Sequence, residues 1–390
     1  MSGYVRGMVF SEIIKITLIF LITLGGIYCA LATIFVREFF GSKKEVARGT
    51  RYIPISVLKP IKGMDPELRE NLLSFSTQNY PEYEIICGVT NSTDAAVPTA
   101  EEIVRSSKGK ARIVVGREAL GVNEKVTNLH ALLEAATYPL VAISDSDMRV
   151  DSSYLSHIVG EYFSDKNVGL VTSLYKISDP ASLGSALESL TVALDFIPSV
   201  IVARRLEGIT FGLGASMLFS KGALEDAGGV SVIADYLADD YQIGNRLWTR
   251  GYKIILSRLV LENVIGNMSI TEFLAHQLRW ARTYRACRPK GFLGYGMTHI
   301  FPLAFLFLIL FGPGHLSLSI IGMVLVLRTS LAIVVYKMVI RSRKWIRWVT
   351  LIPVKDLLSF GIWLWSFCGN KVSWRGSSYE IIQGGRIKQG

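Results

Sequence analysis

The sequence predicts an α/β domain with a Rossmann-like, doubly wound sheet, flanked by transmembrane helices. Between residues 53 and 173, short apolar runs alternate with segments of helical pattern, as in parallel sheets. Half of the 390 residues are hydrophobic and the mean hydropathy is +0.36, which is apolar for a soluble enzyme. Uncharged stretches at 16–36 and 291–327 lie outside the alternating region. We therefore expect a soluble domain joined to a membrane-embedded part.

The first apolar stretch is expected to be a transmembrane anchor over residues 13–37. It is too long for a signal-peptide core and no clear cleavage site follows, so we expect it to be retained. The second is expected to form a transmembrane helix pair over residues 291–340, split at Gly312-Pro313-Gly314. Residues 349–370 are predicted to be a third apolar helix, re-entrant or interfacial because it is short, before a tail at 371–390.

The net charge is +10, and positive residues gather beside the apolar segments. These two clusters are Arg37, Lys43, Lys44, Arg48 and Arg51, and Arg341, Arg343, Lys344 and Arg347. By the positive-inside rule they predict a multi-pass protein with a cytoplasmic catalytic domain, in a bacterial inner membrane or, in a eukaryote, the Golgi. Anionic lipid headgroups are the expected partners of this charge, and no nucleic-acid module signature is present. The four cysteines are scattered, which fits a reducing compartment.

The soluble domain is expected over residues 50–290. Strands are predicted at 53–58, 83–89, 111–115, 140–143 and 168–173, and helices at 66–77, 99–106, 152–162 and 269–288. Residues 121–130 are expected to be a loop that enters a further helix, which continues to residue 136. Asp65 is expected to cap the first of these helices, with Pro66 at its first position. The stretch 183–205 is expected to be amphipathic and close to the membrane surface. Residues 209–219 are strand-like, and their glycines permit close approach to a ligand.

The central motif of the domain is LVAISDSDMRV, which starts at Leu140. Its apolar run predicts a strand buried on both faces, and Asp145 and Asp147 follow at the carboxyl end, where open α/β sheets bind ligands. Alternate residues of an extended chain share a face, so both carboxylates are expected to bind one divalent cation, Mg²⁺ or Mn²⁺. The alternative is a solvated turn, since Asp and Ser are common turn formers.

Other polar residues follow the predicted strands in the same way. Lys59 lies in a basic loop after the first strand, which suits a nucleotide, although a plain strand-to-helix loop is the alternative. Asp94 follows the second strand. Lys125, with Asn123 and Asn128, starts a helix and is expected to counter phosphate charge. There is no GxGxxG or Walker loop, which disfavours NAD-binding and P-loop proteins.

Two later helices carry further candidate residues. Asp239 and Asp240 begin one helix, either as a carboxylate base at the mouth of a cleft or as acidic residues that complement the helix dipole. His276, Arg279 and Trp280 lie on the polar face of the helix at 269–288. Arg and Trp are also common in helices at a membrane interface, which is the alternative for this face.

Six motifs, in this order, resemble the ceramide glucosyltransferase family and its bacterial relatives that glycosylate hopanoid lipids. The motifs are VLKPIKGMDPEL from Val57, GVNEKVTNL from Gly121, DSDMRV from Asp145, ADDY from Ala238, HQLRW from His276 and WRGSSY from Trp374. The resemblance implies a membrane-anchored nucleotide-sugar transferase fold of the GT-A type. It also implies transfer of a hexose, glucose or N-acetylglucosamine, from a UDP-sugar to a lipid hydroxyl with inversion.

The family's functional residues carry over by position. The resemblance implies that Asp94, Asp145 and Asp240 are its three aspartates, with Asp240 as the base. It also implies that Arg279 and Trp280 are its RW pair. Lys59, Lys125 and His276 are the further residues expected in the substrate site. The chain departs from the family at His276, where Gln or Arg is usual. It also has Asp147 where the animal enzymes have Gly, which completes a metal-binding pair.

The chemistry of these residue types agrees with lipid glycosylation. A diphosphate leaving group needs charge neutralisation from a cation with Lys or Arg, and a lipid hydroxyl needs a carboxylate to take its proton. Two alternatives remain open. A processive polysaccharide synthase shares the three aspartates, although its Q-x-x-R-W motif is imperfect here. A membrane protein that keeps the fold only as a non-catalytic binding module is the other.

Overall fold

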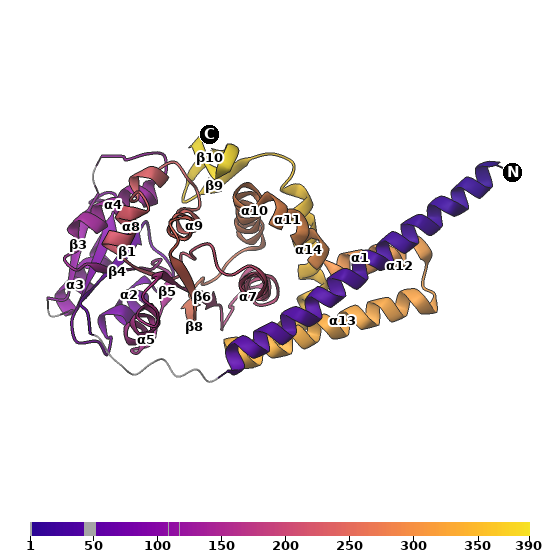
Figure 1. Ribbon diagram of the computed structural model, residues 1–390, viewed down its shortest axis with the longest axis horizontal. Helices are drawn as coiled ribbons and strands as arrows, with labels where there is room; N and C mark the ends of the chain where they lie inside the picture. Colours follow the sequence, from indigo (N-terminus) through magenta and orange to yellow (C-terminus); the bar gives the residue numbers. More distant parts are fainter. Residues whose placement is uncertain (1, 43–51, 108, 117) are drawn as a thin grey trace.

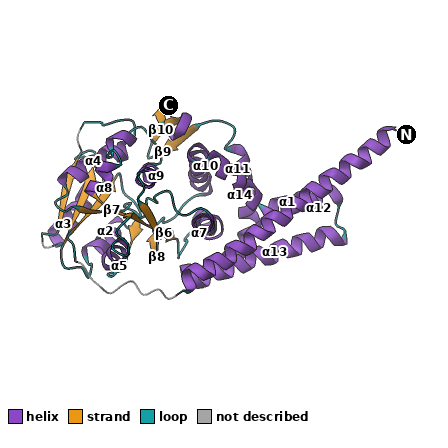
Figure 2. Cartoon of the chain, viewed as in Figure 1, coloured by secondary structure: helices purple, strands orange, loops and turns teal. Residues whose placement is uncertain are grey.

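The computed structural model describes residues 2–42, 52–107, 109–116 and 118–390, and shows an α/β domain joined to a bundle of long helices (Figure 1). Four residues of the first basic cluster, Lys43, Lys44, Arg48 and Arg51, lie outside the described residues. The strands of the large sheet gather at one end of the molecule, and the opposite end is built from helices (Figure 2).

The α/β domain contains an eight-stranded mixed sheet with the order β3-β2-β1-β4-β7-β6-β8-β5. The strands are β1 Ile55–Ile61, β2 Tyr83–Val89, β3 Ala111–Val115, β4 Leu140–Ile143, β5 Met148–Arg149, β6 Val168–Lys176, β7 Met217–Ser220 and β8 Lys253–Asn263. Strands β1 to β4 are parallel, as predicted. Strand β7 is antiparallel to β4 and β6, because the chain first crosses the carboxyl ends of the parallel strands before it enters the sheet.

Most helices around this sheet lie close to their predicted positions, whereas α8 and η2 below were not predicted. They are α2 Leu68–Ser76, α3 Val97–Ser106, α4 Glu124–Ala135, α5 Tyr154–Tyr162, α8 Lys221–Asp226 and α9 Asp239–Thr249, with a 3₁₀ turn η2 at Ser231–Ile233. The expected helix cap at Asp65 is wrong. Glu67 precedes α2 with no side-chain cap, and the Asp65 carboxylate instead accepts hydrogen bonds from Ser146 and Arg375. Long-range partners therefore prevail over a local capping signal at this position.

The stretch expected to lie on the membrane surface is instead a buried central helix. It consists of α6 Leu183–Thr191, the π-helical turn η1 Val192–Phe196 and α7 Ile197–Leu206, which follow one another without a break. Side chains are buried around its whole circumference, and 83% of the residues in its most apolar 18-residue stretch are buried. It packs against the N-terminal helix α1 Ser2–Gly41 (Figure 1). The polar residues that suggested an amphipathic surface pattern have buried partners.

Within the residues that the structure describes, four helical segments are long and apolar enough to cross a membrane: 6–41, 183–206, 315–340 and 346–365. They involve α1, the central helix, α13 His315–Val335 with the π-helical turn η4 Tyr336–Ile340, and α14 Ile352–Trp365 with the 3₁₀ segment η5 Lys344–Leu351 before it. The helices α11 Pro289–Tyr295 and α12 Ile300–Phe311 flank the turn η3 Gly296–Thr298; they bend by 55° and would together make a fifth segment. A Cβ at Gly25 of α1 would lie 2.4 Å from the Met297 carbonyl oxygen, so glycine permits this close packing.

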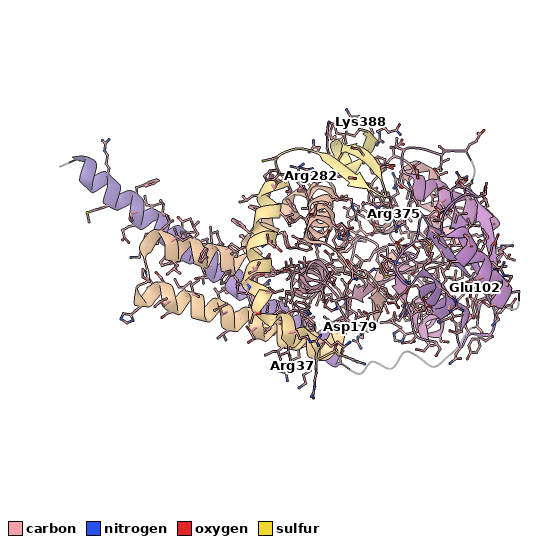
Figure 3. The ribbon with its side chains drawn as sticks, turned by 180° about the vertical axis from the view of Figure 1, so that it is seen from behind. Arg37, Glu102, Asp179, Arg282, Arg375 and Lys388 are labelled. Carbon is pink, nitrogen blue, oxygen red and sulfur yellow. The ribbon has the colours of Figure 1, made fainter. Side chains whose placement is uncertain are left out.

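The last residues fold back over the α/β domain. Strands β9 Lys371–Trp374, β10 Ser377–Ile381 and β11 Ile387–Gln389, with the 3₁₀ turn η6 Gln383–Gly385, form an antiparallel sheet with the order β11-β10-β9. This sheet packs on α10 Ile270–Cys287, whose Arg282 donates to the carbonyl oxygens of Lys371 and Cys368 (Figure 3). The predicted tail is thus an ordered part of the domain.

Candidate active site

A cavity of about 710 Å³ lies between the carboxyl ends of the strands and the helices α7, α10, α11 and α14. One side of it is charged and includes Lys62, Asp65, Lys125, Asp145, Asp147, Asp239, Asp240, Arg279, Arg288 and Arg375. The other side is largely apolar and includes Phe196, Val200, Ala203, Phe292, Tyr295, Ile362 and Trp363. The cavity therefore joins the strand-end motifs to helices of the membrane-type bundle.

Lys125 connects two of the carboxylates. Its Nζ lies 2.8 Å from Asp145 Oδ1 and 3.1 Å from Asp239 Oδ2. The start of α4 aims it there, because the side chain of Asn123 accepts hydrogen bonds from the backbone N–H groups of Lys125 and Val126. Burial lowers the pKa of Lys125, but the carboxylates of Asp145, Asp239 and Asp240 outweigh burial and raise it overall. The lysine is therefore a fixed positive charge.

Asp147 carries a buried carboxylate, one oxygen of which is free for a ligand. Its Oδ1 is buried without a hydrogen-bond partner among the described residues. Burial, and then the charges of Asp145 and Asp65, raise the pKa of Asp147 to about 6. A pair of carboxylates with an unpartnered buried oxygen suits a divalent cation.

Asp240 is held by backbone groups at the start of α9. Its Oδ2 accepts the Gly214 N–H at 2.8 Å, and its Oδ1 accepts the Tyr241 N–H at 2.7 Å. Burial, and then the neighbouring Asp239, raise the pKa of Asp240 to about 6. Gly214 is needed here, because a Cβ would lie 2.8 Å from Asp145 Oδ2 and 3.4 Å from Asp240 Oδ2. Asp145 and Asp240 thus face the same small space.

Asp65 and Arg375 are site residues that the sequence prediction missed. Arg375 Nη1 donates to Asp65 Oδ1 at 2.8 Å and to the Lys62 carbonyl at 2.9 Å. It approaches from the C-terminal sheet (Figure 3). The WRGSSY motif that contains Arg375 was the available signal, but sequence position alone does not bring the tail to the strand ends.

Helix α10 contributes Arg279, Trp280 and His276 to the cavity, as predicted. Burial lowers the pKa of Arg279 to about 10, and its guanidinium lies 5.9 Å from the ring centroid of Trp374. His276 Nδ1 lies 3.1 Å from Glu188 Oε1, and Gln277 also donates to this carboxylate. Glu188, buried in α6, was not predicted; it belonged to the stretch assigned to the membrane surface.

Trp280 stands within an aromatic cluster. Its ring centroid lies 6.2 Å from that of Tyr175 and 5.8 Å from that of Phe196, and all three side chains line the cavity. The tryptophan therefore shapes the boundary between the charged and the apolar side.

Two predicted substrate-binding residues do not line the cavity. Strand β1 continues through Lys59, which is fully buried; its Nζ donates to the Asp145 carbonyl at 2.5 Å and lies 3.8 Å from the Phe75 ring centroid. Asp94 accepts hydrogen bonds from the backbone N–H groups of Gly63 and Ala96. Both residues support the strand ends from outside the cavity, because nearby backbone groups occupy their polar atoms.

Comparisons with known proteins identify the family and the fold of the chain. The sequence pattern of glycosyl transferase family 21 matches residues 17–387. Ceramide glucosyltransferase 3 of Caenorhabditis elegans is 30% identical over 250 residues, which are 64% of this chain and 54% of that protein. Poly-beta-1,6-N-acetyl-D-glucosamine synthase of Staphylococcus aureus (strain COL) is 24% identical over 238 residues, 60% of this chain and 56% of that protein. The chain spans about half the length of the curated relatives it matches.

One solved structure superposes over most of the chain. It is a mannosyltransferase from Pyrobaculum calidifontis in complex with GDP-Man and Mn²⁺, with a TM-score of 0.56 and 18% identity. The match covers 90% of this chain and 99% of that chain. The α/β domain therefore has the GT-A fold that the resemblance implied.

Proposed function

Because this chain belongs to glycosyl transferase family 21, we propose that it is an inverting enzyme that transfers glucose or N-acetylglucosamine from a UDP-sugar to the hydroxyl of a membrane lipid such as ceramide or a hopanoid. One observation carries the proposal. A single cavity is bounded both by the charged strand-end residues and by the aromatic side chains of the helix bundle. The charged wall is complementary to a nucleotide sugar, and the apolar wall is complementary to a lipid.

The charged side suits the donor. Lys125, Arg279 and Arg375 bring positive charge to the cavity beside Asp145 and Asp147. Arg279 makes no hydrogen bond or ion pair within the described part of the chain, although its guanidinium lies over the Trp374 ring and near the charge of Glu188. The N–H groups of this half-buried guanidinium are therefore free to donate to a diphosphate group.

Asp145 and Asp147 would hold a divalent cation, Mg²⁺ or Mn²⁺. The described residues contain no group of three or more His, Cys, Asp or Glu side chains arranged around a metal, so the donor's phosphates would supply further ligands. A cation bound there neutralises charge on the diphosphate leaving group. The mannosyltransferase with the same fold carries Mn²⁺ in its complex with GDP-Man, which supports this assignment.

Asp240 is the proposed general base. The lipid hydroxyl oxygen attacks the anomeric carbon, the bond from that carbon to the phosphate oxygen breaks, and UDP leaves with the electron pair. Asp240 takes the hydroxyl proton, and this single displacement inverts the sugar's anomeric centre. Its raised pKa, about 6, suits a base that works near neutral pH.

The membrane arrangement is part of the proposal. We propose a multi-pass protein whose catalytic domain is cytoplasmic. The basic clusters flank the apolar helices, and by the positive-inside rule such positively charged flanks face the cytoplasm. Positive residues near the end of α13, among them Arg341 and Arg343, lie where anionic headgroups would meet the protein. The acceptor would then reach the apolar side of the cavity from the bilayer.

Labelled donors test the proposal. Membranes containing the full chain are incubated with labelled UDP-glucose or UDP-N-acetylglucosamine, and the labelled lipid is identified by mass spectrometry. We expect one lipid carrying a single sugar, formed at a rate lower by roughly 10²- to 10⁴-fold with the matched variant Asp240→Asn. No UDP release from the wild-type chain with any lipid extract would contradict the proposal.

The staphylococcal polysaccharide synthase favours a second candidate, a processive synthase. The same incubation separates the two, because a synthase would yield a polymer of many sugars whereas a lipid glycosyltransferase stops after one.

A further inference from the structure

A buried ionic cluster lies within the helix bundle, away from the strand-end carboxylates. Arg328 Nη2 lies 3.1 Å from Asp195 Oδ1, and Lys355 Nζ lies 2.7 Å from both Asp195 Oδ2 and Asp356 Oδ1. Arg328 also pairs with Asp356, Nε to Oδ2 at 2.8 Å. Two carboxylates and two cations balance, so the cluster has no net charge. Ionisable residues within such apolar helices are costly and mark functional sites by default.

Only one of these four side chains reaches the cavity. Asp195 lines it, whereas Arg328, Lys355 and Asp356 are buried behind Asp195 and are absent from its wall. Asp195 lies in the π-helical turn η1, and such turns insert an extra residue into a helix, frequently at functional sites. The cavity thus has a carboxylate at its helical side, apart from the charged groups of both signs at its donor side.

Two hydroxyl groups line the cavity with Asp195. Ser359 Oγ lies 3.4 Å from Asp195 Oδ2, which is long for a hydrogen bond between a hydroxyl and a carboxylate. The hydroxyl of Tyr295 makes no hydrogen bond within the described ranges, although its ring packs against His299. Polar atoms that face an apolar wall without good partners are costly, and a ligand's polar group would satisfy them.

We propose that Asp195, Ser359 and Tyr295 form a subsite that binds a second polar group of the acceptor lipid, next to its reacting hydroxyl. This inference rests on the proposed lipid glycosylation and deepens it. The group is uncharged and carries a hydrogen-bond donor, such as an amide N–H or a second hydroxyl, because Asp195 presents an acceptor to the cavity. A phosphate headgroup is disfavoured, because both cations of the cluster are already paired with carboxylates and leave no free positive charge to compensate it.

Side-chain variants test this subsite in the full chain, purified in phosphatidylcholine nanodiscs. Ser359→Ala and Tyr295→Phe each remove only a hydroxyl, and Asp195→Asn removes the charge at nearly constant shape. The matched control is Ser366→Ala, at the end of the same helix α14, whose hydroxyl donates to the Trp363 carbonyl outside the cavity. The acceptor probe is a short-chain ceramide, compared with its N-methyl analogue.

We expect Ser359→Ala and Tyr295→Phe each to raise the acceptor KM by about 2- to 10-fold, the change expected for one lost hydrogen bond. The KM for UDP-glucose should stay constant, and Ser366→Ala should behave as wild type. The N-methyl analogue lacks the amide N–H donor of ceramide. With this analogue, at least one variant should raise the acceptor KM less than with ceramide, because the hydrogen bond that the variant removes cannot form. A polyprenyl phosphate should neither accept sugar nor compete.

Several outcomes would overturn the subsite. An unchanged acceptor KM in both hydroxyl variants, equal rises in the donor and acceptor KM, or effective competition by the polyprenyl phosphate would each do so. Asp195→Asn breaks the ionic cluster, so its kinetics are interpreted only if its melting temperature matches that of the wild type. If the melting temperature differs, the two hydroxyl variants alone decide the test. If the wild-type chain glycosylates no lipid at all, both the proposed function and the subsite are rejected. If the wild type transfers sugar and the variants have the same acceptor KM, only the subsite is rejected.

Discussion

Asp65 and Arg375 form an ion pair at the wall of the cavity, with Arg375 Nη1 2.8 Å from Asp65 Oδ1. The two residues are separated by almost the whole chain, and the pair fixes the C-terminal sheet over the strand ends. Ser146 donates to the same Asp65 carboxylate. The pair thereby connects the tail to the loop that carries Asp145 and Asp147.

The first prediction follows from this pair. Arg375→Ala removes a cation beside Asp65 and Asp147, so the KM for the UDP-sugar should rise by about 10-fold or more, as expected for lost hydrogen bonds to a charged group. Steady-state kinetics with varied donor measures it. The matched control is Lys388→Ala in β11 of the same sheet, which loses only an exposed pair with Glu380 (Figure 3). Equal effects of the two variants would show that the sheet acts only through folding.

The second prediction separates two adjacent carboxylates. Asp240→Asn should lower kcat by roughly 10²- to 10⁴-fold, the scale of a general base, with little change in donor binding. Asp239→Asn should cost far less, because Asp239 pairs with Lys125 whereas Asp240 is held by backbone N–H groups that leave it free to take a proton. Single-turnover rates and donor titrations check this. If the Asp239 variant were the inactive one, the base would be assigned to the wrong residue.

The third prediction concerns pH. A base must be deprotonated to accept a proton, and the pKa of Asp240 is raised to about 6 by burial and then by Asp239. The rate should therefore be full above this pKa and fall as the pH drops through about 6, approaching tenfold per unit. A pH profile of kcat/KM measures it. The residual activity of Asp240→Asn should depend less on pH near 6, because the ionising carboxylate of Asp240 is gone. If the variant and the wild type had the same pH profile, the ionisation would belong to another group.

The fourth prediction concerns the metal. Chelation should abolish transfer, and Mg²⁺ or Mn²⁺ should restore it, because Asp145 and Asp147 place carboxylates where the diphosphate is expected. Asp147→Asn should weaken the response to metal with little change in the melting temperature, since its Oδ1 has no hydrogen-bond partner among the described residues. Activity assays with metal titration, beside thermal unfolding, check both parts. Full activity of the wild type in excess chelator would reject the metal site.

The fifth prediction concerns topology. The C-terminal sheet pairs with the α/β domain, where Tyr236 and Arg386 form a β-bridge, so the C-terminus and this domain should lie on the same side of the membrane. A tag placed after Gly390 should be accessible from the cytoplasm, on the side predicted by the basic clusters. Protease protection of sealed vesicles measures it. A tag reached only from outside would contradict the cytoplasmic placement.

The sequence by itself determined the local elements and the main carboxylates. Alternating apolar runs and helix starts predicted strands β2 to β4 and the first residue of α9 correctly, because burial period and capping are local properties. The strand-end position of Asp145 also followed from the sequence. The carboxyl end of β4 brings Asp145 to the edge of the sheet, where Lys125 of α4 pairs with it. Asp240 reaches the same space from the start of α9, which follows no parallel strand directly.

Only the tertiary structure decided which polar groups are already satisfied and which face the cavity. Lys59 and Asp94 match the motifs, yet nearby backbone groups occupy their polar atoms. Asp65 was expected to cap a helix, but Arg375 from the far end of the chain binds it instead. The stretch around Asp195 was expected on the membrane surface but is buried. Burial is possible because the carboxylate of Asp195 forms ion pairs with cations on α13 and α14. Such pairings depend on distances between segments remote in sequence, and local pattern carries no information about those distances.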